Sequence, residues 1–245
     1  MKVISSCISV IFLTSLLFGQ ASFHHTEMKM GCRFDITVVA IGQEEADRFL
    51  EIALDEIDRI EKLISSWDES SQTSAINRKA GIAPVKVDRE LFELIKRCIG
   101  LSELTSGAFD ISYASMDKIW RYDGSMKEMP SQQEIRNSVS NVGFDKIVLD
   151  DSESTVFLPD PGMKIGFGAI GKGYAADRTK SLLKEQGVES AIVNASGDLN
   201  AWGQQANGEN WKVAITNPLN KSKAFAWLPV QDRAVVTSGN YEKYV

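Results

Sequence analysis

The sequence predicts an α+β fold, with mixed or antiparallel sheets packed against helices in a single domain. Most strand-like segments are joined by short, turn-rich connections, as in hairpins, whereas a doubly wound parallel sheet would need helical crossovers. Two long stretches show apolar residues at helical spacing, as expected of helices lying on a sheet. The 245 residues contain no internal repeat and no low-complexity linker, so a second folded domain is not expected.

The first 21 residues predict a secretory signal peptide. Lys2 gives a short positive start, and the apolar stretch from Ile8 to Phe18 is too short to cross a bilayer. Small residues follow up to Ala21, where signal peptidase would cleave. The alternative, a buried N-terminal helix, is less favoured because the segment has neither a polar face nor caps. We therefore expect an exported chain whose mature part, residues 22–245, is soluble and has no transmembrane span.

The N-terminal part of the mature chain predicts a strand followed by two helices. The strand is expected from Met28 to Ile41, with Gly31 permitting a bulge. A helix follows from Gln43, and a second begins after Asp88, a predicted N-cap. The segment between them, Ser65–Asn77, is polar and without periodicity. The expected buried faces are Ala46, Phe49, Leu50, Ala53, Leu54, Ile57, Ile60, Leu63 and Ile64 in the first helix, and Leu91, Phe92, Leu94, Ile95, Cys98, Ile99 and Leu101 in the second.

The rest of the chain predicts short strands around two further helices. Ser131–Glu134 is a capping-box pattern that opens a short helix, and a hairpin is expected within residues 145–160. A strand near Met163–Phe167 leads through a glycine run into a helix from Gly171 to Glu185. Further strands are expected on either side of a turn at Ser196-Gly197, and at Trp211–Thr216, Ala224–Val230 and Ala234–Thr237.

Composition and histidine content exclude several classes of function. The net charge is −6 and the basic residues are scattered, so a nucleic-acid-binding surface is not expected. The only histidines, His24 and His25, lie near the expected mature N-terminus, where chains are usually poorly ordered. A histidine general base or a histidine-ligated zinc is therefore not expected. A bound metal would be held by oxygen ligands, which favours Mg²⁺ or Ca²⁺.

Two cysteines, Cys32 and Cys98, remain after cleavage of the signal peptide. An oxidising compartment would permit a bridge between them. The preferred interpretation is two small buried side chains without a bridge, because Cys98 lies on the apolar face of a predicted helix. The sequence has no C-x-x-C pair, which excludes a cysteine zinc site.

The glycine run "GFGAIGKG" at residues 166–173 fits two nucleotide-binding patterns at once. A phosphate loop needs Ser or Thr after the lysine, but Gly173 stands there. A dinucleotide-binding turn needs an acid at the end of the next strand, but that strand ends in Asn194. A plain structural alternative is a tight corner between a strand and a closely packed helix. Lys172 at the start of this helix nevertheless favours an anionic, phosphate-bearing ligand.

One longer segment around this run resembles a known family. "GAIGKGYAADR", residues 168–178, resembles the G-A-I-A-K-G-Y-A-x-D signature of the ApbE family, the FAD:protein FMN transferases, which would imply a T-fold-like domain. Other segments in the family's order are similar to its motifs. They are "MGCRF" from Met30, "SSWDESSQTSAIN" from Ser65, "SGAFDIS" from Ser106, "NASGDLNAWG" from Asn194 and "AVVTSGNYEKY" from Ala234.

The resemblance implies a periplasmic, magnesium-dependent enzyme, with or without association with the membrane. Such an enzyme cleaves the pyrophosphate of FAD and attaches FMN to a Ser or Thr of a target protein. The family's targets are flavin-carrying subunits of membrane redox complexes, such as sodium-pumping quinone reductases. Two alternatives stay open: an FAD pyrophosphatase that releases FMN and AMP, and an FAD-binding or scavenging protein without transfer. The cofactor-binding residues implied are Met30, Trp67, Ala108, Phe109, Asp110 and Lys172, and the backbone carbonyl of Ala169 would be a magnesium ligand.

Three departures from the family pattern bear on this interpretation. Trp67 stands where the family usually has Tyr, which keeps an aromatic face but loses the phenol. Gly166 stands where the family usually has Asp, so one carboxylate near the cofactor is absent. The family continues after T-S-G with H-I-x-D-P and with an Asp and a Thr that complete the magnesium site, whereas this sequence ends at Val245. We therefore expect an ApbE-like domain at residues 22–245 that lacks its last segment, and no catalytic side chain is assigned.

Overall fold

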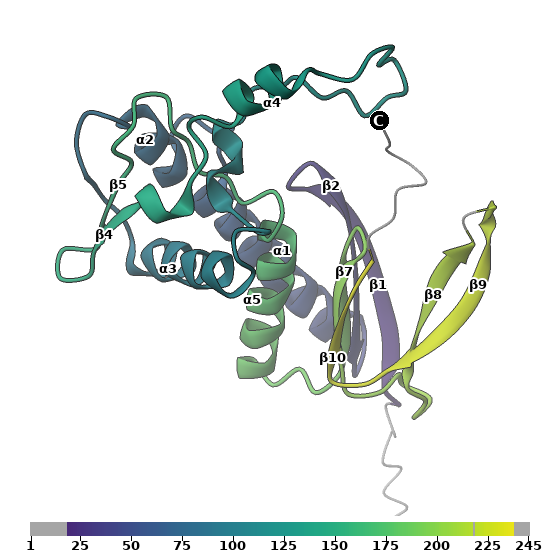
Figure 1. Cartoon of the computed structure of the whole chain (residues 1–245). Helices are drawn as coiled ribbons and strands as arrows, with labels where there is room; N and C mark the ends of the chain where they lie inside the picture. The colour runs from purple at the N-terminus through teal and green to yellow at the C-terminus, as the bar shows by residue number, and fades with distance from the viewer. Residues whose placement is uncertain (1–18, 218, 238–245) are drawn as a thin grey trace, which may run out of the picture.

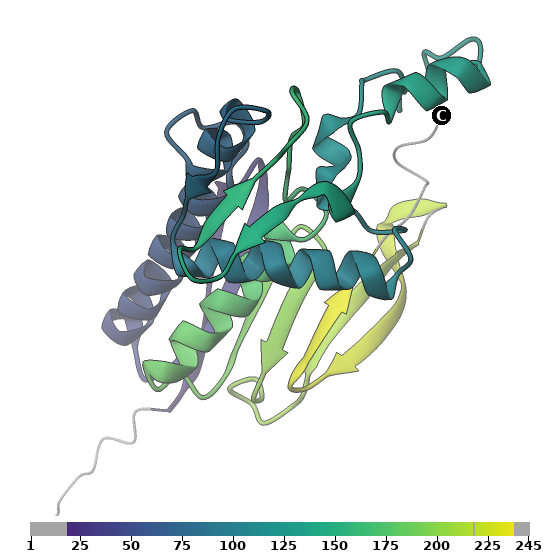
Figure 2. The same ribbon diagram turned by 60° about the vertical axis from the view of Figure 1, so that its left-hand side comes forward.

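The computed structural model describes residues 19–217 and 219–237, which form an α+β domain (Figures 1 and 2). The proposed signal peptide lies almost entirely outside the described residues, so it stays a prediction. Ala21, the expected cleavage position, is the first residue of a strand. No helix in the described ranges is long and apolar enough to cross a membrane.

The centre of the domain is a five-stranded sheet with the strand order β1-β2-β6-β7-β10. Every pairing in this sheet is antiparallel, as expected from the hairpin-rich sequence. Two predicted strands, β6 and β7, join across the turn at Ser196-Gly197. The strands are β1 (Ala21–Lys29), β2 (Cys32–Ala40), β6 (Ala191–Ala195), β7 (Asp198–Trp202) and β10 (Arg233–Val236).

The first hairpin corrects the sequence analysis. One strand was expected from Met28 to Ile41, but the chain folds back at Met30-Gly31, where φ is 51° and 68°. Positive φ at both residues is typical of the two-residue turns that match strand twist. His24 and His25 lie within β1, so they are ordered and not part of a loose terminus. The sequence concealed this strand because it lies at the sheet edge, where side chains are exposed or half-buried and give no apolar run.

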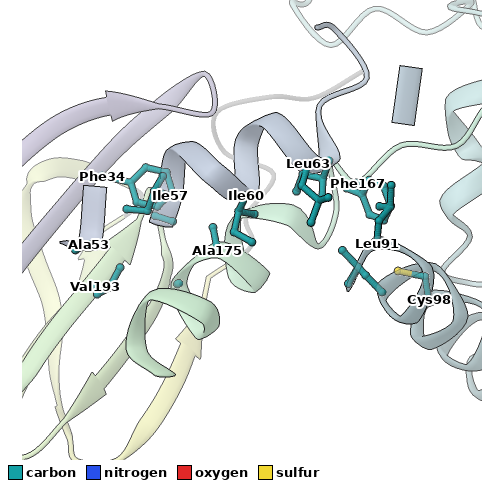
Figure 3. Close-up of a cluster of buried hydrophobic side chains, with 14 of the residues drawn as sticks. Phe34, Ala53, Ile57, Ile60, Leu63, Leu91, Cys98, Phe167, Ala175 and Val193 are labelled. Carbon is teal, nitrogen blue, oxygen red and sulfur yellow. The ribbon is translucent and has the colours of Figure 1, made fainter. Parts of the chain in front are cut away.

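Two helices, α1 (Gln43–Ile64) and α5 (Gly171–Glu185), pack against each other and against the central strands. Figure 3 shows Ile57 and Ile60 of α1 with Ala175 of α5 between the helices. Both isoleucines and Ala175 are fully buried, and the small alanine permits close approach of the helix axes. The apolar face expected for α1 is confirmed, except that Leu54 is only half-buried.

A second layer lies on the other side of these helices (Figure 2). It contains the expected helix α3 (Arg89–Leu104) and a small antiparallel sheet, β3-β5-β4. The strands are β3 (Val85–Lys86), β4 (Val148–Asp150) and β5 (Thr155–Phe157), of which the last two form the expected hairpin. Helix α4 (Gln132–Ser138) begins with the expected capping box, and short 3₁₀ helices lie at Ile111–Ser115 and Phe144–Lys146.

The polar segment Ser65–Asn77 contains a helix that the sequence did not reveal, α2 (Gln72–Arg78). Ser71 caps it, its hydroxyl accepting a hydrogen bond from the Ser74 N–H at 3.0 Å. Two turns of mostly polar residues show no apolar stripe, so periodicity cannot detect such a helix.

Residues 163–167 do not form the strand expected there. The side chain of Asn77 hydrogen-bonds both backbone groups of Ile165, accepting from its N–H at 2.8 Å and donating to its carbonyl at 3.0 Å. Ser115 does the same for Lys164, at 2.7 and 2.9 Å. Side chains thus take the place of a neighbouring strand, which satisfies the backbone without a ladder.

A charged cluster connects α1, α3 and α5. The Arg59 guanidinium donates to Glu56 at 2.7 Å and to Glu90 at 2.6 Å, and the Tyr174 hydroxyl donates to Glu90 at 2.8 Å. Arg178 lies 3.3 Å from Glu90. Hydrogen bonding from Arg59 holds the pKa of the Glu90 carboxyl below its ordinary value. The cluster fixes the rotation of α5 relative to α1 and α3.

Two strands ahead of β10 form a separate hairpin, β8 (Trp211–Asn217) and β9 (Asn220–Val230), that projects beside the main sheet (Figure 1). Both were expected. The thiols of Cys32 and Cys98 are free; Cys98 is buried as expected, whereas Cys32 is only half-buried. Burial raises the pKa of Cys98 to about 12.

Candidate functional site

Two adjacent pockets lie around the loop that leads into α5, and both are lined by Gly168. The first pocket, about 330 Å³, lies between the β1–β2 turn, the end of α1 and the start of α5. The second pocket, about 610 Å³, lies between this loop and the segment after α3. The expected site residues all line them: Met30, Trp67 and Lys172 the first, and Ala108, Phe109, Asp110 and Ala169 the second.

Met30 lies in the first pocket because of a strained backbone. A non-glycine residue in the left-handed region costs roughly 1–2 kcal/mol, and Met30 has φ 51°. Its N–H donates to Glu61 Oε2 at 3.0 Å, which fixes the hairpin turn to the last turn of α1. Strain of this kind persists where surrounding contacts determine the conformation, and it is typical of binding sites.

Trp67 presents a flat apolar surface at the rim of the first pocket. Its side chain is 85% exposed, in a loop that is otherwise polar. The Lys118 ammonium lies 5.4 Å from the ring centroid, over one face of the indole. An exposed aromatic face beside a pocket is suited to stacking with a planar ring such as a flavin.

Asp110 lines the second pocket, but its carboxylate is occupied by the protein. Oδ1 accepts hydrogen bonds from the N–H and the hydroxyl of Ser112, both at 2.7 Å, and Oδ2 accepts from the Phe144 N–H at 3.1 Å. The Ser112 hydroxyl in turn accepts from the Gly143 N–H at 2.7 Å. These bonds order the wall of the pocket around Asp110, and the contact to the cofactor that the resemblance implies stays a prediction.

The glycine run forms a close-packed corner, as its structural alternative suggested. A β-carbon at Gly168 would overlap the Tyr113 hydroxyl, and one at Gly166 would lie 3.1 Å from the Ala114 Cβ. A β-carbon at Gly171 would lie 2.7 Å from Ile64 Cδ1, whereas one at Gly173 would meet nothing. At three of the four glycines a β-carbon would therefore press on a neighbouring side chain.

The start of α5 offers groups suited to an anion. In the described chain, the backbone N–H groups of Lys172 and Gly173 donate to no protein acceptor. The Lys172 ammonium forms no ion pair with any described carboxylate, and this half-buried residue lines the first pocket. A free helix N-terminus beside a lysine is a favourable place for phosphate oxygens.

The fit to a magnesium ion is incomplete. The Ala169 carbonyl accepts no hydrogen bond from residues 19–217 or 219–237 and is open as a ligand. Those same residues contain no group of three or more His, Cys, Asp or Glu side chains that could hold a metal. One carbonyl does not satisfy a cation that prefers six oxygen ligands. The described residues therefore do not form a magnesium site on their own.

The ApbE family model matches residues 30–245. The chain belongs to the ApbE family. The FAD:protein FMN transferase of Klebsiella pneumoniae (strain 342) is 33% identical over 223 residues, covering 91% of this chain and 67% of the relative. The FAD:protein FMN transferase of Treponema pallidum (strain Nichols) is 31% identical over 198 residues, covering 75% of this chain and 55% of the relative.

Solved ApbE structures share the fold. The ApbE protein of Thermotoga maritima aligns with a TM-score of 0.79 at 28% identity, over 90% of this chain and 71% of that one. The flavin transferase ApbE of Vibrio cholerae also aligns with a TM-score of 0.79, at 21% identity, over 91% of this chain and 73% of that one. The chain spans about 55–67% of the length of the two relatives described above.

Three residues at the ApbE-like site escaped the sequence analysis. Glu61 holds the Met30 turn, Lys118 covers Trp67, and Tyr113 contacts Gly168. Each of them contacts a residue at least 31 positions away in the chain, so no local pattern identifies them. Glu61 is one of many acids on α1, and Tyr113 directly follows the recognised "SGAFDIS" segment.

Proposed function

We propose that this chain acts as an FAD:protein FMN transferase that requires Mg²⁺ and attaches FMN to a Ser or Thr of an acceptor protein. The observation that carries the proposal is the convergence of seven residues from distant segments on two pockets that share Gly168. Membership of the ApbE family and the names of the relatives support it.

The arrangement divides the tasks of dinucleotide binding. In the proposal, the flavin ring stacks near Trp67 and Met30 in the first pocket, and the phosphates lie at the start of α5 beside Lys172. A helix N-terminus and a lysine stabilise phosphate charge and hold the reacting phosphorus in place. Such positioning supplies most of the catalysis in phosphoryl transfer.

The reaction would replace the phosphoanhydride bond of FAD with a phosphoester bond to the acceptor. The acceptor hydroxyl oxygen forms a bond to the phosphorus of the FMN moiety, and the pyrophosphate bond to the AMP phosphate breaks. AMP leaves with the bridging oxygen, and the hydroxyl proton passes to solvent. His24 and His25 are not candidates for a base at this site, because they lie in the edge strand β1 and line neither pocket.

The acceptor and compartment are expectations from the family resemblance. We expect acceptors among flavin-carrying subunits of membrane redox complexes and a location in the periplasm. An exported location agrees with the N-terminal sequence. Magnesium would use the Ala169 carbonyl, and no step of the proposed reaction is derived from the metal.

A binding protein without turnover is the second candidate. It is favoured by the incomplete set of metal ligands in the described chain and by Gly166, which brings no carboxylate to the loop. Such a protein would bind FAD through the same pockets. A third activity, hydrolysis of FAD to FMN and AMP, would use the same phosphate site with water in place of the hydroxyl.

One experiment separates the three candidates. The protein is incubated with FAD, with and without Mg²⁺, and with a flavin-carrying subunit of a sodium-pumping quinone reductase. Transfer gives a fluorescent, covalently flavinylated subunit together with AMP. Hydrolysis gives FMN and AMP in equal amounts without labelled subunit, and a binding protein gives neither product but retains FAD. Failure to bind FAD at all would contradict the proposal.

A further inference from the structure

Tyr113 lies where the two pockets meet. It belongs to the 3₁₀ helix Ile111–Ser115 and lines the second pocket, and its hydroxyl oxygen accepts a hydrogen bond from the Gly168 N–H at 3.1 Å. Gly168 lines both pockets. The phenol therefore reaches the border between them from the opposite wall.

The proton of the Tyr113 hydroxyl is available for a hydrogen bond to a ligand. A phenol hydroxyl can donate one hydrogen bond and accept others. Because its bond to Gly168 uses it as acceptor, its own proton is not used there, and it donates to no atom of residues 19–217 or 219–237. The side chain is partly exposed, at 40%, so a ligand in the second pocket can reach it.

The surroundings hold the phenol in a fixed place. A β-carbon at Gly168 would overlap its oxygen, and one at Gly166 would lie 3.6 Å from it. The 3₁₀ helix that carries the ring is capped by Asp110 through Ser112. The phenol is therefore pre-positioned at Gly168, which directly precedes Ala169 and is close in sequence to the free N–H groups at the start of α5.

We propose that the Tyr113 hydroxyl donates a hydrogen bond to a diphosphate oxygen of the bound dinucleotide, while its oxygen holds the Gly168 peptide. This rests on the proposed function, because FAD is the ligand. Tyr113 is thus a phosphate-binding residue at the point where the ligand passes between the pockets. The neutral phenol would donate a directional hydrogen bond to the diphosphate, whereas Lys172 supplies a positive charge.

The test compares ligands with and without phosphate in the variant Tyr113→Phe. The change removes the hydroxyl but keeps the ring. A hydrogen bond to a charged group contributes enough to expect about tenfold or more weaker binding of FAD. Riboflavin, which has the same ring system and no phosphate, should bind with unchanged affinity. Binding is measured by flavin fluorescence or calorimetry, and thermal melting confirms that the variant folds.

Tyr122→Phe is the matched control. Tyr122 is 52% exposed and lines neither pocket, so this change should leave the affinity for both ligands unaltered. Equal loss of FAD and riboflavin binding in Tyr113→Phe would overturn the inference, because it would show that the hydroxyl only orders the loop. Unchanged FAD affinity would overturn it as well. If the parent protein bound FAD no more tightly than riboflavin, the phosphates would add no affinity, and the proposed function would fail at the same time.

Discussion

Replacement of Asn77 by alanine should destabilise the protein and weaken its site together. Asn77 makes two hydrogen bonds to the backbone of Ile165, which is fully buried. The variant loses both bonds and leaves an N–H and a carbonyl without partners. Each buried group left unsatisfied costs about 1–3 kcal/mol, so we expect a loss of about 2–4 kcal/mol in the free energy of unfolding.

Urea unfolding followed by circular dichroism measures this loss, and FAD affinity should fall in the same variant. The affinity depends on Ile165 because the segment that follows it carries Gly168. Asn207→Ala is the control, since Asn207 makes an exposed turn hydrogen bond to the Glu209 N–H at 3.0 Å and should cost less than about 1 kcal/mol. A loss below about 0.5 kcal/mol for Asn77→Ala would refute the view that its side chain replaces a strand neighbour.

Three further changes test the site and its support. Trp67→Ala should weaken FAD binding about tenfold through lost stacking, with little change in stability because the side chain is 85% exposed. Gly171→Ala should lower the free energy of unfolding by about 1–3 kcal/mol, since its β-carbon would lie 2.7 Å from an isoleucine methyl group. Gly173→Ala, whose β-carbon would meet nothing, should be neutral or stabilise the helix by up to about 1 kcal/mol. Arg59 lowers the pKa of the Glu90 carboxyl, so ionised Glu90 stabilises the protein at pH values above the ordinary pKa of 4.5. This contribution is lost as the pH falls through the folded-state pKa. The free energies of unfolding of Glu90→Gln and of the parent, measured in urea, should therefore converge at low pH.

Each of these results has a matched comparison. Trp227→Ala removes an exposed tryptophan from β9, away from both pockets, and should leave FAD affinity unchanged. Glu153→Gln changes an exposed acid whose ion pair with Lys86 is long, at 3.6 Å, and should show little pH dependence of its effect. Equal effects of Trp67→Ala and Trp227→Ala on FAD binding, or equal costs at Gly171 and Gly173, would contradict the structural reasons given.

The sequence predicted what depends on local periodicity and missed what depends on distant partners. The apolar faces of α1 and α3 and the β6–β7 hairpin follow from local side-chain patterns. The sequence of residues 163–167 predicted a strand, because nothing local shows that Asn77 and Ser115 will bind its backbone. Strand β1 was overlooked because an edge strand with exposed polar residues carries no apolar alternation.

The same distinction applies to the site. The family resemblance, and not local periodicity, named all seven expected residues that line the two pockets. It could not show that the carboxylate of Asp110 is occupied by Ser112 and Phe144. Nor could it show Tyr113 at the border of the pockets, since its contact to Gly168 joins residues 55 positions apart.

The shared position of Gly168 also governs when the site can exist during synthesis. Both pockets need this residue, while their other walls are made by segments that include Met30, Trp67 and Phe109. A nascent chain that has not reached residue 168 therefore contains these three residues but neither pocket. In the proposed function, nucleotide binding can therefore begin only after more than two thirds of these 245 residues have been made.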